Sequence, residues 1–169
     1  IRLDSTGPVL FRQQRMGYRG KVFHMLKFRT MRERPACECE ETARQDAMTA
    51  DDDDRITSVG RFLRRTRLDE LPQIVNVLRG EMSWIGPRPE AVTLSMWYEA
   101  ELPFYLYRHI VRPGITGWAQ VNHGHVTSLE EVHDKLRYDF YYIKNFSAWL
   151  DVLIALRTVP TMMSGYGSR

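Results

Sequence analysis

The 169-residue sequence is poor in cysteine and has no long apolar run. Its two cysteines, Cys37 and Cys39, stand too close together for a disulfide that would connect distant segments, which favours a reducing compartment. No stretch reaches the roughly 18 to 20 consecutive apolar residues of a transmembrane helix, and no secretory signal peptide is visible. An initiating methionine is also missing, so we expect the chain to be a piece of a longer protein.

A large excess of charge of one sign is missing too. Twenty-four Lys and Arg residues accompany 21 Asp and Glu residues, and the formal net charge of +3 permits phosphate ligands, nucleic acid or anionic lipid as partners without choosing among them. The hydrophobic content of 43% and the charged content of 27% are those of a globular protein and exclude wholesale disorder. The length suits one domain, so we predict a single domain over residues 1–169.

Turn signals and hydrophobic periodicity divide the chain into a hairpin and several helices. Apolar-rich segments on either side of a turn at residues 17–20 predict a β-hairpin over residues 8–29. Residues 33–54 gather acidic side chains and predict a solvated loop or a short exposed helix. Helical patterns follow in three places: from residue 58 to Gly80, over 129–143, and over 147–159, where Pro160 interrupts the pattern. The predicted fold class is α+β, mostly helical.

An acidic pair, Asp69 and Glu70, stands where the best-defined helical pattern begins. The pattern has one apolar face, formed by Leu71, Ile74, Val75 and Leu78. Proline is tolerated only in a first turn, so Pro72 places the helix start near Asp69 or Glu70. Adjacent carboxylates at this place are able to hold a divalent cation and to offer an attacking oxygen to phosphorus. For an isolated pair, helix capping is the commoner explanation, so the chemical role needs support from neighbouring residues.

Cations supply that support along the sequence. They are Lys27, Arg29, Arg61, Arg64, Arg65, Arg67, Arg88 and Arg112. Arginine forks match phosphate oxygens and stay charged, although any single one is more often a surface residue. Arg88 and Arg112 are the stronger candidates, because neighbouring prolines fix the backbone that presents them.

Four motifs stand out along the chain. They are Lys-Phe-Arg-Thr-Met at 27–31, Leu-Asp-Glu-Leu-Pro-Gln at 68–73, Gly-Pro-Arg-Pro at 86–89 and Val-Arg-Pro-Gly-Ile-Thr-Gly-Trp-Ala-Gln-Val-Asn at 111–122. Together they resemble the bacterial sugar transferases, the monotopic polyprenyl-phosphate phosphoglycosyl transferases. The motifs occur in the family's order, and the resemblance extends from about Gly7 to the final helix. One tetrapeptide would mean little, whereas four matches over nearly the whole chain argue strongly against coincidence.

The resemblance implies transfer of a sugar-1-phosphate from a UDP-sugar to undecaprenyl phosphate with release of UMP. This is the first membrane step of exopolysaccharide, capsule, O-antigen or glycoprotein glycan synthesis. By the match, Asp69 attacks the β-phosphorus and forms a covalent phosphosugar intermediate, while Glu70 assists with Mg²⁺ and the acceptor phosphate. Asp69 and Glu70 are thus the implied metal ligands, and the metal and the arginines would spread the charge of the phosphate oxygens. The phosphate binders that the match implies are Lys27, Arg64, Arg88 and Arg112.

A polyprenyl acceptor implies a site at a bilayer surface, and we expect the cytoplasmic face of the bacterial inner membrane, where nucleotide sugars are found. Family members carry a hydrophobic re-entrant helix before the Gly7 region, and we expect residues 1–169 to represent the catalytic domain without that helix. The aromatic stretch at 97–107 and the helix around 149–156 are, taken alone, more often faces of the core, and the resemblance makes them candidates for interfacial amphipathic contacts. A homodimer is a further expectation from larger relatives, and no nucleic acid partner is expected.

The sequence departs from the family pattern at Arg67, where a small hydroxyl residue is commoner, and at residues 123–125. No local motif identifies the sugar, so glucose, galactose and N-acetylated sugars all remain open. A non-enzymatic basic module that docks on lipid or nucleic acid explains residues 61–67, but not the carboxylates that follow them. A Mg²⁺-dependent nuclease needs further acidic ligands in ordered elements, and the Asp51–Asp54 run is too loop-like to supply them.

Overall fold

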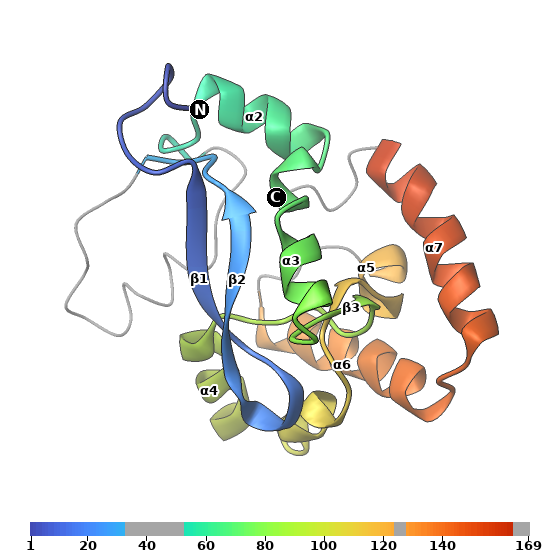
Figure 1. Cartoon of the computed structure of the whole chain (residues 1–169). Coiled ribbons are helices and arrows are strands. Elements are labelled where there is room, and N and C mark those ends of the chain that lie inside the picture. Colours follow the sequence, from blue (N-terminus) through green and yellow to red (C-terminus); the bar gives the residue numbers. More distant parts are fainter. Residues whose placement is uncertain (33–52, 124–127, 164–169) are drawn as a thin grey trace.

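The computed structural model describes residues 1–32, 53–123 and 128–163, and its fold is α+β and mostly helical, as predicted. The acidic segment at 33–52 with its two cysteines, and the departures Gly124 and His125, lie outside the described residues. In Figure 1 a long hairpin runs beside α2 and α3, with α4 below it and with α6 and α7 beyond α3.

The hairpin is the predicted one. Strand β1 (Leu10–Met16) pairs antiparallel with β2 (Val22–Phe28), so that Leu10 lies opposite Phe28. The short 3-10 helix η1 (Tyr18–Gly20) reverses the chain between them, and Gly20 takes a φ of +72°, a left-handed conformation that glycine adopts without steric cost. Turn chemistry visible in the sequence therefore sets the register.

Helix α2 (Ser58–Arg65) packs backbone against backbone on the segment that follows β2. The Thr57 side chain caps its first turn by accepting from Gly60 N, and the Thr57 N–H donates to Thr30 O. A Cβ at Gly60 would overlap the Thr30 carbonyl. The close approach fixes the start of α2 beside residues 27–31.

The acidic pair lies in a separate 3-10 turn, η2 (Leu68–Glu70), and the α-helix α3 (Gln73–Leu78) begins only after Pro72. The expected helix start at Asp69 or Glu70 is thus three or four residues too early. The cause is Arg67, whose φ of 58° breaks helical continuity after α2 and starts a tighter turn.

Helix α3 buries polar rather than apolar side chains. Gln73 is 1% exposed and Asn76 0%, whereas Leu78 on the predicted apolar face is 82% exposed. The Asn76 amide accepts from Leu26 N at 3.0 Å and donates to His24 O at 2.8 Å. Asn76 therefore satisfies the outer backbone groups of β2, which have no further strand to pair with in the described sheet.

A second, two-stranded parallel sheet joins the remaining motifs. Strand β3 (Ser83–Ile85) pairs with β4 (Gly114–Thr116), which brings the turn at 86–89 beside the segment at 112–117. A Cβ at Gly86 would press on the Arg112 carbonyl, and a Cβ at Gly117 would overlap the Gly86 carbonyl. These two glycines allow the two motifs to lie in direct backbone contact.

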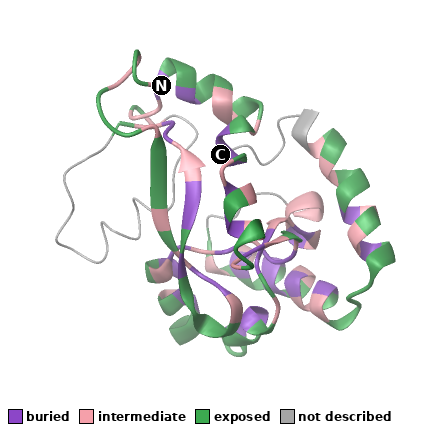
Figure 2. Ribbon diagram, viewed as in Figure 1, coloured by how far each residue is buried: buried purple, intermediate pink, exposed green. Residues whose placement is uncertain are grey.

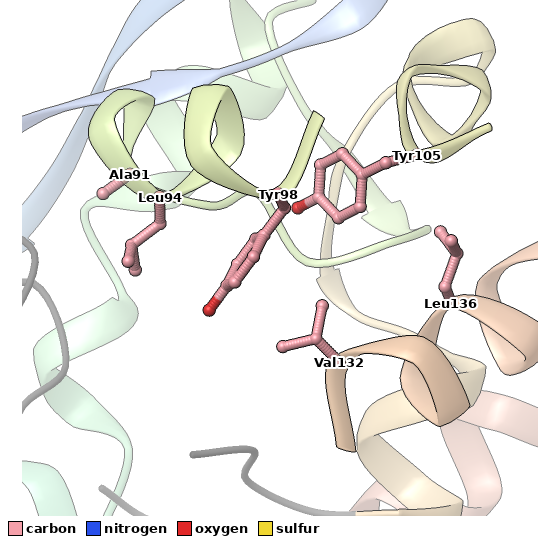
Figure 3. Close-up of a cluster of buried hydrophobic side chains, with 6 residues drawn as sticks. All are labelled: Ala91, Leu94, Tyr98, Tyr105, Val132 and Leu136. Atoms are coloured by element: carbon pink, nitrogen blue, oxygen red, sulfur yellow. The ribbon is translucent and has the colours of Figure 1, made fainter. Parts of the chain in front are cut away.

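The main core lies between α4 (Val92–Glu101), the 3-10 helix η3 (Tyr105–Ile110) and α6 (Leu129–Lys144). Its buried members, drawn in Figure 3, are Ala91, Leu94, Tyr98, Tyr105, Val132 and Leu136. A capping box between Ser128 and Glu131 starts α6. The aromatic stretch at 97–107 therefore contributes in part to the core, as the commoner alternative for it predicted, because its two buried tyrosines face α6.

Helix α7 (Ala148–Met163) follows α6 and the short α5 (Trp118–Asn122) packs against both. Pro160 lies inside α7, so the expectation that it interrupts the helix is wrong. Figure 2 shows green, exposed positions along α7, and its exposed apolar side chains are Trp149, Val152, Leu156 and Val159. Within the described ranges, no helix has both the length and the apolar character needed to cross a membrane.

Candidate active site

The η2 turn holds both acidic side chains in the interior, with Asp69 6% exposed and Glu70 9% exposed. The turn lies between α2 and α3 and packs against β2. Burying two adjacent carboxylates is unfavourable unless cations or hydrogen-bond donors accompany them. The neighbours of the pair therefore decide what it does.

One oxygen of Glu70 is the meeting point of three cations. Glu70 Oε1 lies 2.6 Å from Arg88 Nη2, 3.1 Å from Lys27 Nζ and 3.9 Å from Arg67 Nη1. These residues come from the turn after β3, from β2 and from the residue that precedes η2. Burial by itself raises the pKa of Glu70, but the charges of Arg88 and Lys27 outweigh it and lower that pKa well below its usual range. Glu70 is thus a permanent counter-charge that gathers the cations.

Asp69 has a different environment. Burial raises the pKa of Asp69, the charge of Lys27 opposes this rise, and neighbouring Glu70 adds to it. Its Oδ1 atom is buried and accepts no hydrogen bond from any residue in the described part of the chain. A buried acceptor without a donor is costly, so this oxygen is the atom of the pair whose hydrogen-bonding capacity is unused.

The structure brings together three of the four predicted phosphate binders. Lys27 and Arg88 contact Glu70, and Arg64 is close enough to Asp69 to lower its pKa while its Nε donates to Thr30 Oγ1. Arg112 is exposed, and no hydrogen bond or ion pair joins it to either carboxylate. The proline-fixed turn thus places Arg112 beside Gly86 but not at the acidic pair.

Sequence reasoning counted Arg67 among the cations that precede the carboxylates but did not select it as a phosphate binder. Its left-handed backbone turns its guanidinium towards Glu70 three residues later. The i to i+3 spacing was visible, but the 3-10 turn that makes it effective was not. With Arg67 included, four cations accompany two carboxylates, and this excess of positive charge suits an anionic diphosphate.

The described residues contain no group of three or more side chains of the types that bind metals. Magnesium, however, is commonly held by one or two carboxylates together with substrate phosphates. The unpartnered Asp69 Oδ1 fits that arrangement, whereas Glu70 Oε1 is already engaged by cations. The acidic pair is therefore compatible with a metal that arrives with its phosphate ligand.

A buried serine, histidine and glutamate also lie together, but they do not form a second reactive site. Ser95 Oγ lies 3.2 Å from His109 Nε2, and the same nitrogen lies 3.4 Å from Glu99 Oε1. Because one ring nitrogen serves both partners, the histidine cannot relay a proton between them as a triad does. Ser95 is also wholly buried, so no substrate reaches it.

Known proteins with similar sequences point to one family. A sequence model of the family described as "Bacterial sugar transferase" matches residues 1–165. The chain is 50% identical over 170 residues to an Aeromonas hydrophila protein named UDP-N-acetylgalactosamine-undecaprenyl-phosphate N-acetylgalactosaminephosphotransferase, covering 100% of this chain and 38% of that protein. Two further relatives are named UDP-glucose:undecaprenyl-phosphate glucose-1-phosphate transferase, and the chain is 45% identical to each. The match to the Caulobacter vibrioides protein covers 97% of this chain and 60% of that protein. The match to the Escherichia coli protein covers 94% of this chain and 33% of that protein. The chain thus spans between a third and three fifths of the length of these relatives.

Proposed function

The chain belongs to the bacterial sugar transferase family, and on that premise we propose that it transfers a sugar-1-phosphate from a UDP-sugar to undecaprenyl phosphate and releases UMP. The observation that carries the proposal is the buried, unpartnered Asp69 Oδ1 beside an excess of cations. The names of the relatives support the same reaction class. Because those names include both N-acetylgalactosamine and glucose, they leave the sugar open.

In the proposed mechanism the reaction passes through Asp69 in two displacements. Asp69 Oδ1 attacks the β-phosphorus of the UDP-sugar, the bond from that phosphorus to the bridging oxygen breaks, and UMP leaves with the electron pair. The resulting aspartyl-phosphosugar is then attacked by a phosphate oxygen of undecaprenyl phosphate, which restores the Asp69 carboxylate. Dividing one difficult displacement into two in this way is the usual benefit of a covalent intermediate.

The cations act on the charge that moves during these steps. Lys27, Arg64 and Arg88 surround the acidic pair and would stabilise the phosphate oxygens and the departing UMP. Glu70 stays ionised because of its low pKa and keeps the cation cluster together when substrate is absent. Asp69 and Glu70 would hold Mg²⁺ with the phosphates, and the metal would neutralise charge on the diphosphate.

The acceptor places the proposed reaction at a membrane surface, and we propose the cytoplasmic face of the bacterial inner membrane. Exposed apolar side chains on two regions support docking there: Phe62, Leu71, Val75 and Leu78 near α2 and α3, and Trp149, Val152, Leu156 and Val159 on α7.

Flotation with anionic lipid vesicles tests the proposed docking. The paired change Trp149→Ser and Leu156→Ser should reduce co-flotation several-fold, while Val22→Ser on the hairpin should not. Equal flotation of both variants would refute docking through α7. A homodimer remains a proposal that light scattering in detergent tests.

The decisive experiment is UMP release from a panel of UDP-sugars with Mg²⁺ and undecaprenyl phosphate in detergent. We expect Asp69→Asn to lose at least about 10³-fold in kcat, because an amide is not a nucleophile at phosphorus. Asp134→Asn, an exposed aspartate on α6, is the matched control and should retain the parental rate. Without the acceptor lipid, the parent should gain the mass of one sugar phosphate, and Asp69→Asn should not.

The possible results separate the reaction from its mechanism. Parental UMP release that survives in Asp69→Asn would contradict the nucleophile assignment while leaving the reaction intact. No release from any sugar by the parent, combined with retained vesicle binding, would instead favour a non-enzymatic lipid-docking module.

A further inference from the structure

The turn that carries Arg88 is held by four consecutive backbone carbonyls. The Pro87 carbonyl accepts from Gly114 N at 3.0 Å, and the Glu90 carbonyl accepts from Met16 N at 3.0 Å. Between them, the Arg88 carbonyl accepts from Arg108 Nη2 at 2.9 Å and the Pro89 carbonyl from Arg15 Nη1 at 3.0 Å. We call this set of four hydrogen bonds the carbonyl clamp. Its donors come from β4, β1 and η3, so three distant segments fix one turn.

Regular strand pairing does not extend through this turn. Pro87 and Pro89 have no N–H group to donate, so a regular ladder cannot continue through them. A small crevice borders the turn, lined in part by Met16, His109 and Val111. A displacement of the Arg88 backbone would move its guanidinium relative to Glu70.

Among the donors of the clamp, Arg108 is the one whose presence is hardest to explain by a contribution to protein stability. It is 3% exposed, its Nη2 also lies 2.8 Å from Oδ2 of Asp139, and its Nη1 donates to the Tyr105 hydroxyl at 2.6 Å. Asp139 is 2% exposed. Replacing a buried ion pair by well-packed apolar side chains is often neutral or stabilising, so such a pair is weak evidence for a stabilising role. What an apolar pair lacks is a directed donor for the Arg88 carbonyl.

We propose that Arg108, oriented by Asp139, is a positioning residue that fixes the backbone of Arg88 and so keeps the Arg88 guanidinium at the acidic pair. Its consequence for turnover rests on the proposed function, because Arg88 acts there on the phosphate of the substrate. Its consequence for the contact between Arg88 and Glu70 does not depend on any reaction. Arg88 Nη2 donates to Glu70 Oε1 at 2.6 Å and is the nearest of the three cations around that oxygen.

The variant that tests the proposal is Arg108→Lys. A lysine keeps the positive charge beside Asp139 but has one nitrogen in place of the two that now serve Arg88, Asp139 and Tyr105. We expect kcat to fall about 10- to 100-fold, as small displacements of positioned groups do, with KM for undecaprenyl phosphate changed less than about threefold. His109→Gln is the matched control, because His109 is a buried neighbour on η3 that contacts Ser95 rather than Arg88. It should keep the parental kcat even if it unfolds more easily.

A second measurement follows the Arg88 guanidinium itself. Its side-chain N–H resonances, assigned with Arg88→Lys, should exchange faster with solvent in Arg108→Lys than in the parent and should be unchanged in His109→Gln, because the hydrogen bond from Arg88 Nη2 to Glu70 Oε1 loosens only in the first variant. If Arg108→Lys does not fold, Asp139→Asn takes its place and should change kcat and the Arg88 exchange rate in the same direction.

The two measurements distinguish the possible failures. If neither kcat nor the exchange of the Arg88 guanidinium protons changes in a folded Arg108→Lys protein, or if His109→Gln changes them equally, the positioning role is wrong. If the parent releases no UMP from any sugar, the proposed function fails, and the exchange at Arg88 alone then decides whether Arg108 positions Arg88.

Discussion

Replacing Glu70 with glutamine removes the counter-charge of the cation cluster while keeping the size of the side chain. The three cations lie 2.6, 3.1 and 3.9 Å from Glu70 Oε1. At an effective dielectric constant of about 20, each such pair is attractive by roughly 4 to 6 kcal/mol before the cost of burial is subtracted. Removing one partner of a buried ion pair has a net cost of about 3 to 5 kcal/mol. Glu70→Gln should therefore lose a large part of the ~5 to 15 kcal/mol that a domain of this kind has in total.

The loss of stability in Glu70→Gln should depend on pH. Since the pKa of Glu70 is lowered from its ordinary 4.5 on folding, the ionised carboxylate stabilises the native state above that pH and ceases to do so as the pH falls through the folded-state pKa. The difference in free energy of unfolding between the parent and Glu70→Gln should be full at pH 6 to 7 and should shrink progressively below about pH 4.5.

Urea unfolding followed by circular dichroism between pH 3 and 7 measures this difference. Glu101→Gln, an exposed glutamate at the end of α4, is the control and should change the free energy of unfolding by no more than about 0.5 kcal/mol. Added inorganic phosphate should restore stability to Glu70→Gln more than to the parent, since it replaces the lost negative charge. Equal stability of Glu70→Gln and the parent at pH 7, or a difference that does not vary with pH, would refute this account of the cluster.

Two further predictions concern the packing that places the cluster. Gly60→Ala should lower the free energy of unfolding, measured by urea denaturation, by about 1 to 2 kcal/mol. The overlap of the new Cβ with the Thr30 backbone outweighs the ~1 kcal/mol gain in helix propensity. A more stable variant would contradict the close approach of Gly60 to Thr30. Asn76→Ala should cost about 3 kcal/mol, because it leaves two backbone groups of β2 without partners. It should also speed amide exchange at Leu26, and unchanged exchange there would show that Asn76 does not protect the strand.

Local elements were predictable where local chemistry determines them. The hairpin follows from its turn residues, and α6 begins at a serine three residues before a glutamate, the pattern of a capping box. The prediction at Pro160 was wrong because the low helix propensity of a single residue does not by itself determine where a helix ends. A proline near the end of α7 removes one backbone hydrogen bond, and the helix nevertheless continues to Met163.

Helix α3 shows why periodicity did not reveal the core. The spacing of its apolar residues was right, but Val75 and Leu78 face outwards and Asn76 faces inwards. A helical pattern shows which residues share a face and does not show what that face meets. Here the neighbour is a strand whose outer backbone groups need hydrogen-bond partners, so a buried asparagine is favoured over a leucine.

The sequence by itself determined the family, the acidic pair Asp69 and Glu70, and most of the cations, because these depend on residue types in short motifs. Only the tertiary structure decided that Glu70 collects Lys27 and Arg88 from 43 and 18 residues away, that Arg112 stays apart from them, and that Asp69 keeps an unpartnered oxygen. The physical reason is that the strength of a charge interaction depends on distance and burial, and both are set by how β2, η2 and the turn at 86–89 pack together.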